Sequence, residues 1–161
     1  MQNFSILKVE KKVVVPTFLD YFQNQFKNER ERELLLNLLK DCNNKKNTIY
    51  VLEIDDKKVG LVGITFERVM DSPVLSIDYL FVAKDYRKKT FKELGNIIIS
   101  EFLLNFTVEE IIPKIQEYVM IRYLALYPDM QNEKLANYYL DLIPQSFKIK
   151  ENKDIWILFK L

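Results

Sequence analysis

Four cationic side chains gather directly after an apolar run: Arg87, Lys88, Lys89 and Lys92. The apolar run, 75–82, predicts a buried strand, and the apolar spacing after Thr90 predicts a helix that runs to about Phe106. A strand that leads through cations to a helix N-terminus is typical of an anion site, because the first N–H groups of a helix lack intrahelical partners. We therefore expect a polyanionic ligand here, with the Arg87 and Lys92 side chains exposed to solvent; a solvated basic loop is the alternative interpretation.

The sequence contains no histidine, and this absence limits the chemistry of the protein. It excludes Ser/His and Cys/His nucleophile pairs, an imidazole general base and histidine-based zinc sites. The one cysteine, Cys42, lies near the end of a helical pattern and is interpreted as a small helix residue, not a nucleophile. Any catalysis must therefore rest on carboxylates, tyrosines, backbone dipoles or a cofactor, and no metal site is predicted.

Length, composition and charge indicate one globular domain. A chain of 161 residues suits a single domain, 1–161, and 48% apolar with 29% charged residues are globular values. A net charge of +1 argues against a dedicated nucleic-acid binder. The first residues do not resemble a signal peptide, and no apolar run is long enough to span a bilayer. A single cysteine fits a reducing compartment. We expect a cytoplasmic protein that does not bind nucleic acid or membranes.

The apolar patterns predict an α+β domain: a mixed, mostly antiparallel sheet of about seven strands flanked by helices. Helices are expected from Pro16, across the leucines of 34–39, from Thr90 to Phe106, over 107–118 and over 131–142. The expected strands are 4–10, 48–54, 59–69, 74–82, 119–127, 146–150 and 154–161. In the first strand Phe4, Ile6 and Leu7 are expected to point inward. Gly60 and Gly63 predict a bulge or a close backbone approach.

This element order, with an anion-binding loop after the fourth strand, resembles the GNAT superfamily of acetyl-coenzyme A-dependent N-acyltransferases. Three segments carry the resemblance. Residues 78–87 look like the family's fourth strand and the lead into its pyrophosphate loop. Residues 132–139 match its helix pattern of Asn followed seven residues later by Tyr, and 146–159 resembles its C-terminal hairpin.

The resemblance implies direct transfer of an acetyl group from acetyl-coenzyme A, as cosubstrate, to a primary amine. In the family the backbone of the fourth strand, here Leu80 and Val82, contacts the pantetheine arm. The other coenzyme-binding residues that it implies are Phe81, Arg87, Lys88, Lys89, Thr90, Phe91, Lys92 and Asn132, and Asn132 also fits the role of a polar helix-start residue. The acceptor is expected to be a small-molecule or peptide amine, and the enzyme a monomer or homodimer.

The phosphate loop departs from the family pattern, which is Arg or Gln, two residues, Gly, one residue, then Gly or Ala. Thr90 and Lys92 replace the two small residues. Glycines in such loops allow unusual dihedrals and let backbone N–H groups approach phosphates. Thr90 could instead cap the helix or donate its hydroxyl, and Lys92 could supply a side-chain contact in place of a backbone one.

Two catalytic residues are candidates. The resemblance implies that Tyr139 protonates the departing thiolate, with adjacent Tyr138 as the alternative. Because only a neutral amine attacks, a base must take a proton, and without histidine the candidate is Asp78. Asp78 also fits a plain strand-edge role, and Glu53 and Asp55 are weaker candidates. The rival to an enzyme is a catalytically degenerate GNAT-like domain that binds a ligand or a protein; an RNA-modifying acetyltransferase is the least favoured alternative.

Overall fold

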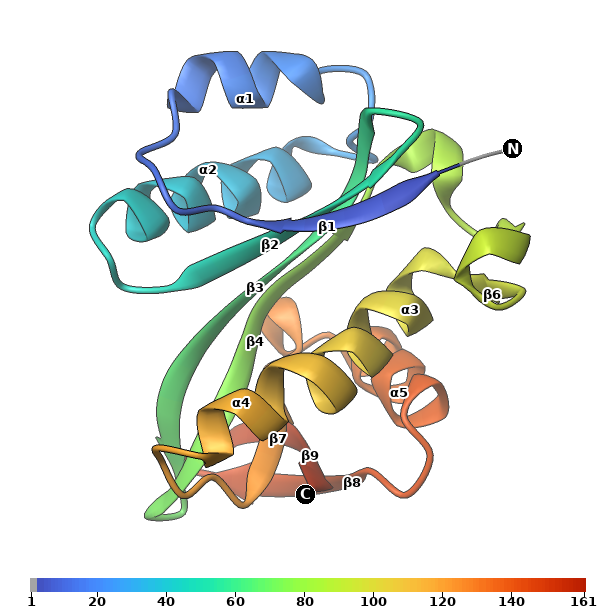
Figure 1. Cartoon of the computed structure of the whole chain (residues 1–161). Coiled ribbons are helices and arrows are strands. Elements are labelled where there is room, and N and C mark those ends of the chain that lie inside the picture. The colour runs from blue at the N-terminus through green and yellow to red at the C-terminus, as the bar shows by residue number, and fades with distance from the viewer. Residues whose placement is uncertain (1–2) are drawn as a thin grey trace. The chain divides into compact units, whose positions relative to one another are not determined.

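The structure is a computed structural model that describes residues 3–161 (Figure 1). Its main sheet has seven strands, which are in sheet order β1 (Phe4–Lys8), β2 (Thr48–Ile54), β3 (Lys57–Val69), β4 (Ser72–Val82), β7 (Tyr123–Leu126), β9 (Asp154–Lys160) and β8 (Phe147–Glu151). The pairing of β4 with β7 is parallel, whereas β1–β2, β2–β3, β7–β9 and β8–β9 pair antiparallel. The predicted fold class, α+β with a mixed, mostly antiparallel sheet, is confirmed.

The helical elements fall where chain chemistry favours them. They are α1 (Val15–Tyr21), α2 (Glu29–Asn43), α3 (Ile99–Phe106), a π-helical segment Thr107–Ile111, α4 (Ile112–Gln116) and α5 (Glu133–Leu142). Pro16 occupies the first turn of α1, where its missing N–H costs nothing. Asn28 caps α2 by accepting a hydrogen bond from the Glu31 N–H. No helix among the described residues is long and apolar enough to cross a membrane.

The chain divides into two compact units. The first comprises Tyr79–Asn105 and the described residues up to Ile64; the second comprises Thr65–Asp78 and Phe106–Leu161. In the second, Val69, Val74, Ala125 and Leu158 form a core. The prediction of a single domain is untested.

Helices cover both faces of β3 in the first unit (Figure 1). A Cβ at Gly63 would clash with the Leu38 side chain of α2, and a Cβ at Gly60 would lie 3.0 Å from Ile99 of α3. Residues three apart on a strand face opposite sides, so the two helices lie on opposite faces. The register of β2 with β3 also shifts between Leu52 and Glu53, beside Gly60. The structure therefore contains both the bulge and the close approaches that the glycines predicted.

The predicted helix from Thr90 to Phe106 is wrong over its first half. Thr90–Phe91 is a short strand, β5, paired antiparallel with β6 (Ile97–Ile98), and α3 begins only at Ile99. Between the two strands a 3-10 turn ends at Gly95, whose φ of 89° is in the left-handed region. Glycine adopts that conformation without a Cβ penalty, so Gly95 directs a hairpin at a point where the apolar spacing alone predicted helix.

Two other elements differ from the prediction. The strand expected over 119–127 is reduced to β7, because the Tyr118 and Val119 N–H groups both donate to the Ile115 carbonyl and continue the turn after α4. Ahead of α4, Pro113 has no N–H to donate, and the Ile112 N–H reaches back to the Thr107 carbonyl, which gives the π-helical segment.

The first strand is also shorter than expected and less buried. It ends at Lys8 instead of continuing to residue 10, and Phe4 and Leu7 are exposed although they were expected to face inward. As the first strand in sheet order, β1 pairs with β2 on one side. The Phe4 ring still contacts the Phe102 ring edge-on, with centroids 5.5 Å apart.

Candidate functional site

The predicted coenzyme residues of the first unit lie at the end of β4 and in the loop that follows it. Phe81 and Val82 are buried and Leu80 is half-buried, so their side chains belong mainly to the core. Beyond Val82 a 3-10 turn, Lys84–Tyr86, leads to the basic segment. This segment does not enter a helix N-terminus, because β5 and β6 intervene before α3. The helix-dipole component of the predicted anion site is therefore wrong.

The lysines of the basic loop are open to solvent. Lys88, Lys89, Thr90 and Lys92 are exposed, whereas Phe91 is half-buried. Lys88 has a φ of 62°, in the left-handed region, so the backbone changes direction there. Three cations therefore remain available to an anionic ligand.

Arg87 is placed differently from its lysine neighbours. Its two terminal nitrogens donate to the two carboxylate oxygens of Glu31 at 2.7 and 3.0 Å, and its Nε donates to the Val82 carbonyl at 2.7 Å. The Arg87 side chain is 27% exposed. The expectation of a solvent-facing Arg87 is wrong, because the guanidinium forms a bidentate ion pair within the protein; whether it also contacts coenzyme stays a prediction.

Three candidate residues of the second unit, Asn132, Tyr138 and Tyr139, belong to α5 or to its N-cap, and Figure 1 shows this helix. Asn132 is the N-cap of α5, and its Oδ1 accepts a hydrogen bond from the Leu135 N–H at 3.0 Å. This is the helix-start role that was the alternative to a coenzyme contact. The cap fixes the beginning of the helix that carries Tyr139 two turns later.

Tyr139 and Tyr138 occupy different environments. Tyr138 is exposed, whereas Tyr139 is half-buried, and their ring centroids lie 6.0 Å apart. Burial, with smaller contributions from Tyr138 and Asp129, raises the pKa of Tyr139 to about 12. The Tyr139 phenol is thus protonated throughout the neutral range, as a proton donor must be.

Asp78 lies on β4 immediately after the segment that pairs with β7. The parallel pairing runs from Val74 to Ile77 opposite Tyr123–Leu126, and Asp78 is the next residue. Its side chain is exposed, so it can exchange protons with solvent. Of the weaker candidates, Glu53 is half-buried on β2 and Asp55 lies in the β2–β3 turn with a φ of 50°.

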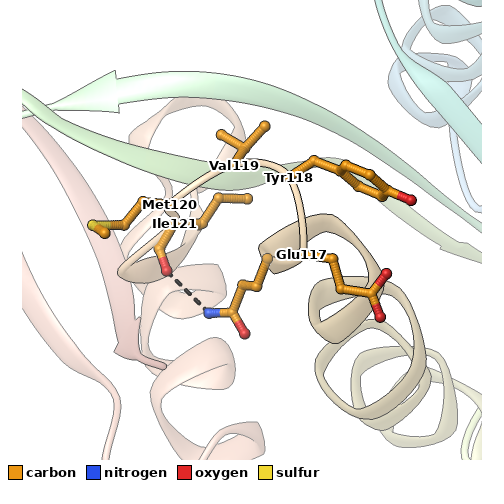
Figure 2. A pocket seen from close by; sticks show the side chains of 6 residues that line it. Glu117, Tyr118, Val119, Met120 and Ile121 are labelled. Atoms are coloured by element: carbon orange, nitrogen blue, oxygen red, sulfur yellow. Dashed lines mark hydrogen bonds between the residues drawn. The ribbon is translucent and has the colours of Figure 1, made fainter.

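A separate hollow lies in the loop between α4 and β7 (Figure 2). It is lined by Gln116, Glu117, Tyr118, Val119, Met120 and Ile121. The Gln116 side-chain amide donates to the Ile121 carbonyl at 3.1 Å and closes the loop. Tyr118 and Met120 are 86% and 72% exposed. None of the predicted site residues lines this hollow.

Sequence reasoning missed two residues that contact the loop region after β4, Gln25 and Glu31. Gln25 exchanges two side-chain hydrogen bonds with Asp85, each of 3.0 Å. A signal for Glu31 was present, since Asn28 followed three residues later by Glu is the pattern of a capping box.

Comparison with known proteins finds a family model that matches part of the chain. Residues 15–91 match the model of the acetyltransferase (GNAT) family, a span that ends at Phe91 and does not include Tyr139. No curated protein matches the chain. Solved structures do match along nearly its whole length.

Three of these structures are similar in fold. A bacterial toxin is 15% identical with a TM-score of 0.72, over 99% of this chain and 92% of that one. The AtaT–AtaR complex bound to DNA is 16% identical with a TM-score of 0.66, over 98% and 93%. A GNAT family acetyltransferase from Elizabethkingia anophelis with acetyl-CoA bound is 14% identical with a TM-score of 0.57, over 99% of both chains. At these identities the likeness concerns the fold. The match of residues 15–91 to the GNAT family model, together with the GNAT fold of the chain, confirms the resemblance to this superfamily.

Proposed function

We propose that the protein is an N-acetyltransferase that transfers an acetyl group from acetyl-coenzyme A directly to a primary amine. The observation that carries this proposal is the exposed cation group, Lys88, Lys89 and Lys92, on the loop that follows β4. The phosphates of the coenzyme would neutralise these charges, and charge-assisted hydrogen bonds to phosphate are stronger than neutral ones.

The positive charges of the loop suit the phosphates of coenzyme A. The backbone of the loop is more restricted than that of the family's loop. Thr90 and Lys92 carry side chains where the family has small residues, and both are exposed. We assign phosphate contacts to the ammonium groups and the Thr90 hydroxyl instead of glycine N–H groups. Backbone groups of Leu80, Phe81 and Val82 contact the pantetheine arm, Phe91 flanks the loop, and Asn132 orients α5.

The proposed chemistry uses one acid and one base. Asp78, directly or through water, takes a proton from the acceptor ammonium, and the neutral amine attacks the thioester carbonyl. A C–N bond forms and the C–S bond breaks. Tyr139 donates its phenolic proton to the departing sulfur, with Tyr138 as the alternative donor. The attacking nitrogen loses its second proton, which returns through water to the tyrosine phenolate, and Asp78 releases its proton to solvent. The products are an acetamide and coenzyme A.

Thermal unfolding with and without coenzyme A tests the proposal directly. At a ligand concentration about 100 times the dissociation constant, linkage predicts a stabilisation of about 2.7 kcal/mol. For a chain of this length, that corresponds to an increase in Tm on the order of 5–10 °C. Adenosine, which lacks the phosphates, serves as the control and should leave the Tm unchanged. No increase at millimolar coenzyme A would contradict the proposal.

A second candidate function is binding of a ligand or protein partner without transfer. The observation in its favour is the β5–β6 hairpin, which separates the basic loop from the N-terminus of α3. AtaT, one of the similar proteins, is found in a complex with AtaR. Acetyl-coenzyme A turnover on a panel of amines distinguishes the two functions, because a binding protein would bind coenzyme without releasing free thiol.

We also propose a single domain over 1–161, a monomer or homodimer, a cytoplasmic location and no nucleic-acid partner. The low net charge supports the last of these. Because the AtaT–AtaR complex binds DNA, this proposal needs its own test. Light scattering on the purified protein and a gel-shift assay with duplex DNA and RNA address oligomeric state and nucleic-acid binding.

A further inference from the structure

Two sets of side-chain contacts connect α2 and the segment before it to the loop after β4, all within the first unit. The first set is centred on Gln25. Its backbone carbonyl accepts from the Lys84 N–H at 3.0 Å, its Oε1 accepts from the Asp85 N–H, and its Nε2 donates to the Asp85 carboxylate. Both side-chain distances are 3.0 Å. Both the oxygen and the nitrogen of the Gln25 amide therefore bond to Asp85.

The second set is the bidentate pair of Glu31 with Arg87. The two N–O distances are 2.7 and 3.0 Å, and the Glu31 and Arg87 side chains are only 21% and 27% exposed. Parallel, partly desolvated bonds of this kind hold both planes in one orientation and are stronger than exposed ion pairs. The third donor, Arg87 Nε, binds the Val82 carbonyl at the end of β4.

Glu31 is itself fixed at the start of α2. Its carboxylate accepts a hydrogen bond from the Lys27 N–H at 2.7 Å, and its N–H donates to Asn28 Oδ1 at 3.1 Å. Its carbonyl accepts from the Tyr79 hydroxyl at 3.2 Å. A displacement of Arg87 would therefore disturb the first turn of α2 as well as the end of β4.

The pair also determines which cations of the loop face a ligand. Arg87 has an extended backbone and a side chain turned onto Glu31, and the next residue, Lys88, has a left-handed φ of 62°. Lys88 and Lys89, which follow this change of direction, are exposed. Because Glu31 neutralises Arg87, the lysines are the charges of the loop that can bind an anion. The pair also holds Arg87, the residue that directly precedes these lysines, in one position.

We propose that Glu31 and Arg87 are positioning residues that hold the Lys88–Lys92 loop in the conformation that binds coenzyme A, and that they couple coenzyme binding to the order of the segment 22–28. This inference rests on the proposed function. Because linkage is reciprocal, coenzyme that fixes the loop also stabilises the contacts of Gln25 and Glu31. Neither residue of the pair is assigned a contact with the reacting atoms.

The test compares Glu31→Gln with Glu33→Gln, two isosteric changes on the same helix. Glu33 is exposed and lies 3.7 Å from Arg30, so its change removes only a surface pair. Isothermal titration with coenzyme A should give a dissociation constant roughly tenfold higher for Glu31→Gln, about 1.4 kcal/mol, and an unchanged one for Glu33→Gln. If Glu31→Gln does not fold, Arg87→Lys, which keeps the charge but cannot form two parallel bonds, should give the same increase.

Amide hydrogen exchange distinguishes positioning from general stability. Addition of coenzyme A should increase the protection of 22–28 in the wild type and in Glu33→Gln, but not in Glu31→Gln. Equal affinity and equal protection in Glu31→Gln would overturn this inference while leaving the proposed function intact. A wild-type protein that does not bind coenzyme A would overturn both.

Discussion

The Tyr86 ring lies nearly parallel to the Phe91 ring, with centroids 6.2 Å apart and planes inclined by 25°. The two residues flank the basic segment 87–90, one at the end of the 3-10 turn and the other in β5. Both side chains are half-buried, so the stack closes the segment into a defined loop. An offset aromatic pair adds about 0.5–1.5 kcal/mol beyond the area that it buries.

Lys92→Ala should weaken coenzyme A binding, because Lys92 lies one residue beyond this stack and is exposed. A lost charged hydrogen bond corresponds to about 1–3 kcal/mol of binding free energy. Lys57→Ala, at the exposed start of β3, is the matched control and should have no effect. Calorimetric titration measures both. Tighter binding by Lys92→Ala would mean that this side chain obstructs the phosphates.

Gly63→Ala should destabilise the protein without changing its chemistry, because the new methyl group meets the Leu38 side chain. Overpacking in a close-packed core typically costs about 1–3 kcal/mol. Urea unfolding measures the loss. Combining Gly63→Ala with Leu38→Ala should make the two changes less than additive, since the second removes the atoms that the methyl group contacts. Strict additivity would contradict the proposed clash.

Elements with a regular alternation or helical spacing of apolar side chains were predicted correctly from the sequence. The prediction was less accurate where local groups turned the backbone in a new direction. The span of β2 was predicted residue for residue, and the β2–β3 turn has Asp55 and Asp56 at positive φ, as a two-residue hairpin requires. The hairpin before α3 was missed because its apolar residues also satisfy a helical spacing. The left-handed Gly95 and Asn96, with φ of 89° and 63°, distinguish the two structures.

At the candidate site, the residue types predicted the charge of the loop, but they did not predict the orientation of its side chains. The lysines of the basic loop are exposed as expected, but the partner of Arg87 is Glu31, which is distant in sequence. A long-range ion pair depends on the three-dimensional path of the chain and leaves no periodic signal. Asn132 was interpreted either as a coenzyme contact or as a helix-start residue, and its capping bond supports the second role.

Asp78→Asn should change the pH dependence of turnover if Asp78 accepts the amine proton. The amide has a similar size but cannot act as a base, so the rate should fall and the acidic limb assigned to this carboxylate should disappear from the profile of kcat/KM. Glu53→Gln, on strand β2, is the comparison variant. A profile of unchanged shape in Asp78→Asn would transfer the role to another base or to water.

Tyr139 should ionise about two pH units above an ordinary tyrosine, because burial is the largest cause that raises its pKa to about 12. Between pH 10 and 12 the folded protein then retains a proton that the unfolded chain releases. The free energy of unfolding therefore falls as the pH rises through this window. Urea unfolding at several pH values should show this decrease in the free energy of unfolding for the wild type but not for Tyr139→Phe. Parallel pH dependences would contradict the shifted pKa.

Tyr139→Phe should lower kcat while leaving coenzyme affinity nearly unchanged, because the hydroxyl is proposed to act only as the thiolate leaves. A general acid contributes about 10²–10⁴-fold, and we expect the lower end, since a thiolate needs less protonation than an alkoxide. The phenol stays protonated at every assay pH, so the variant should be slower without a shift of its pH profile. Tyr138→Phe, one residue away on the exposed side of α5, is the matched control and should retain wild-type turnover. Full turnover by Tyr139→Phe together with loss in Tyr138→Phe would assign the proton to Tyr138 instead.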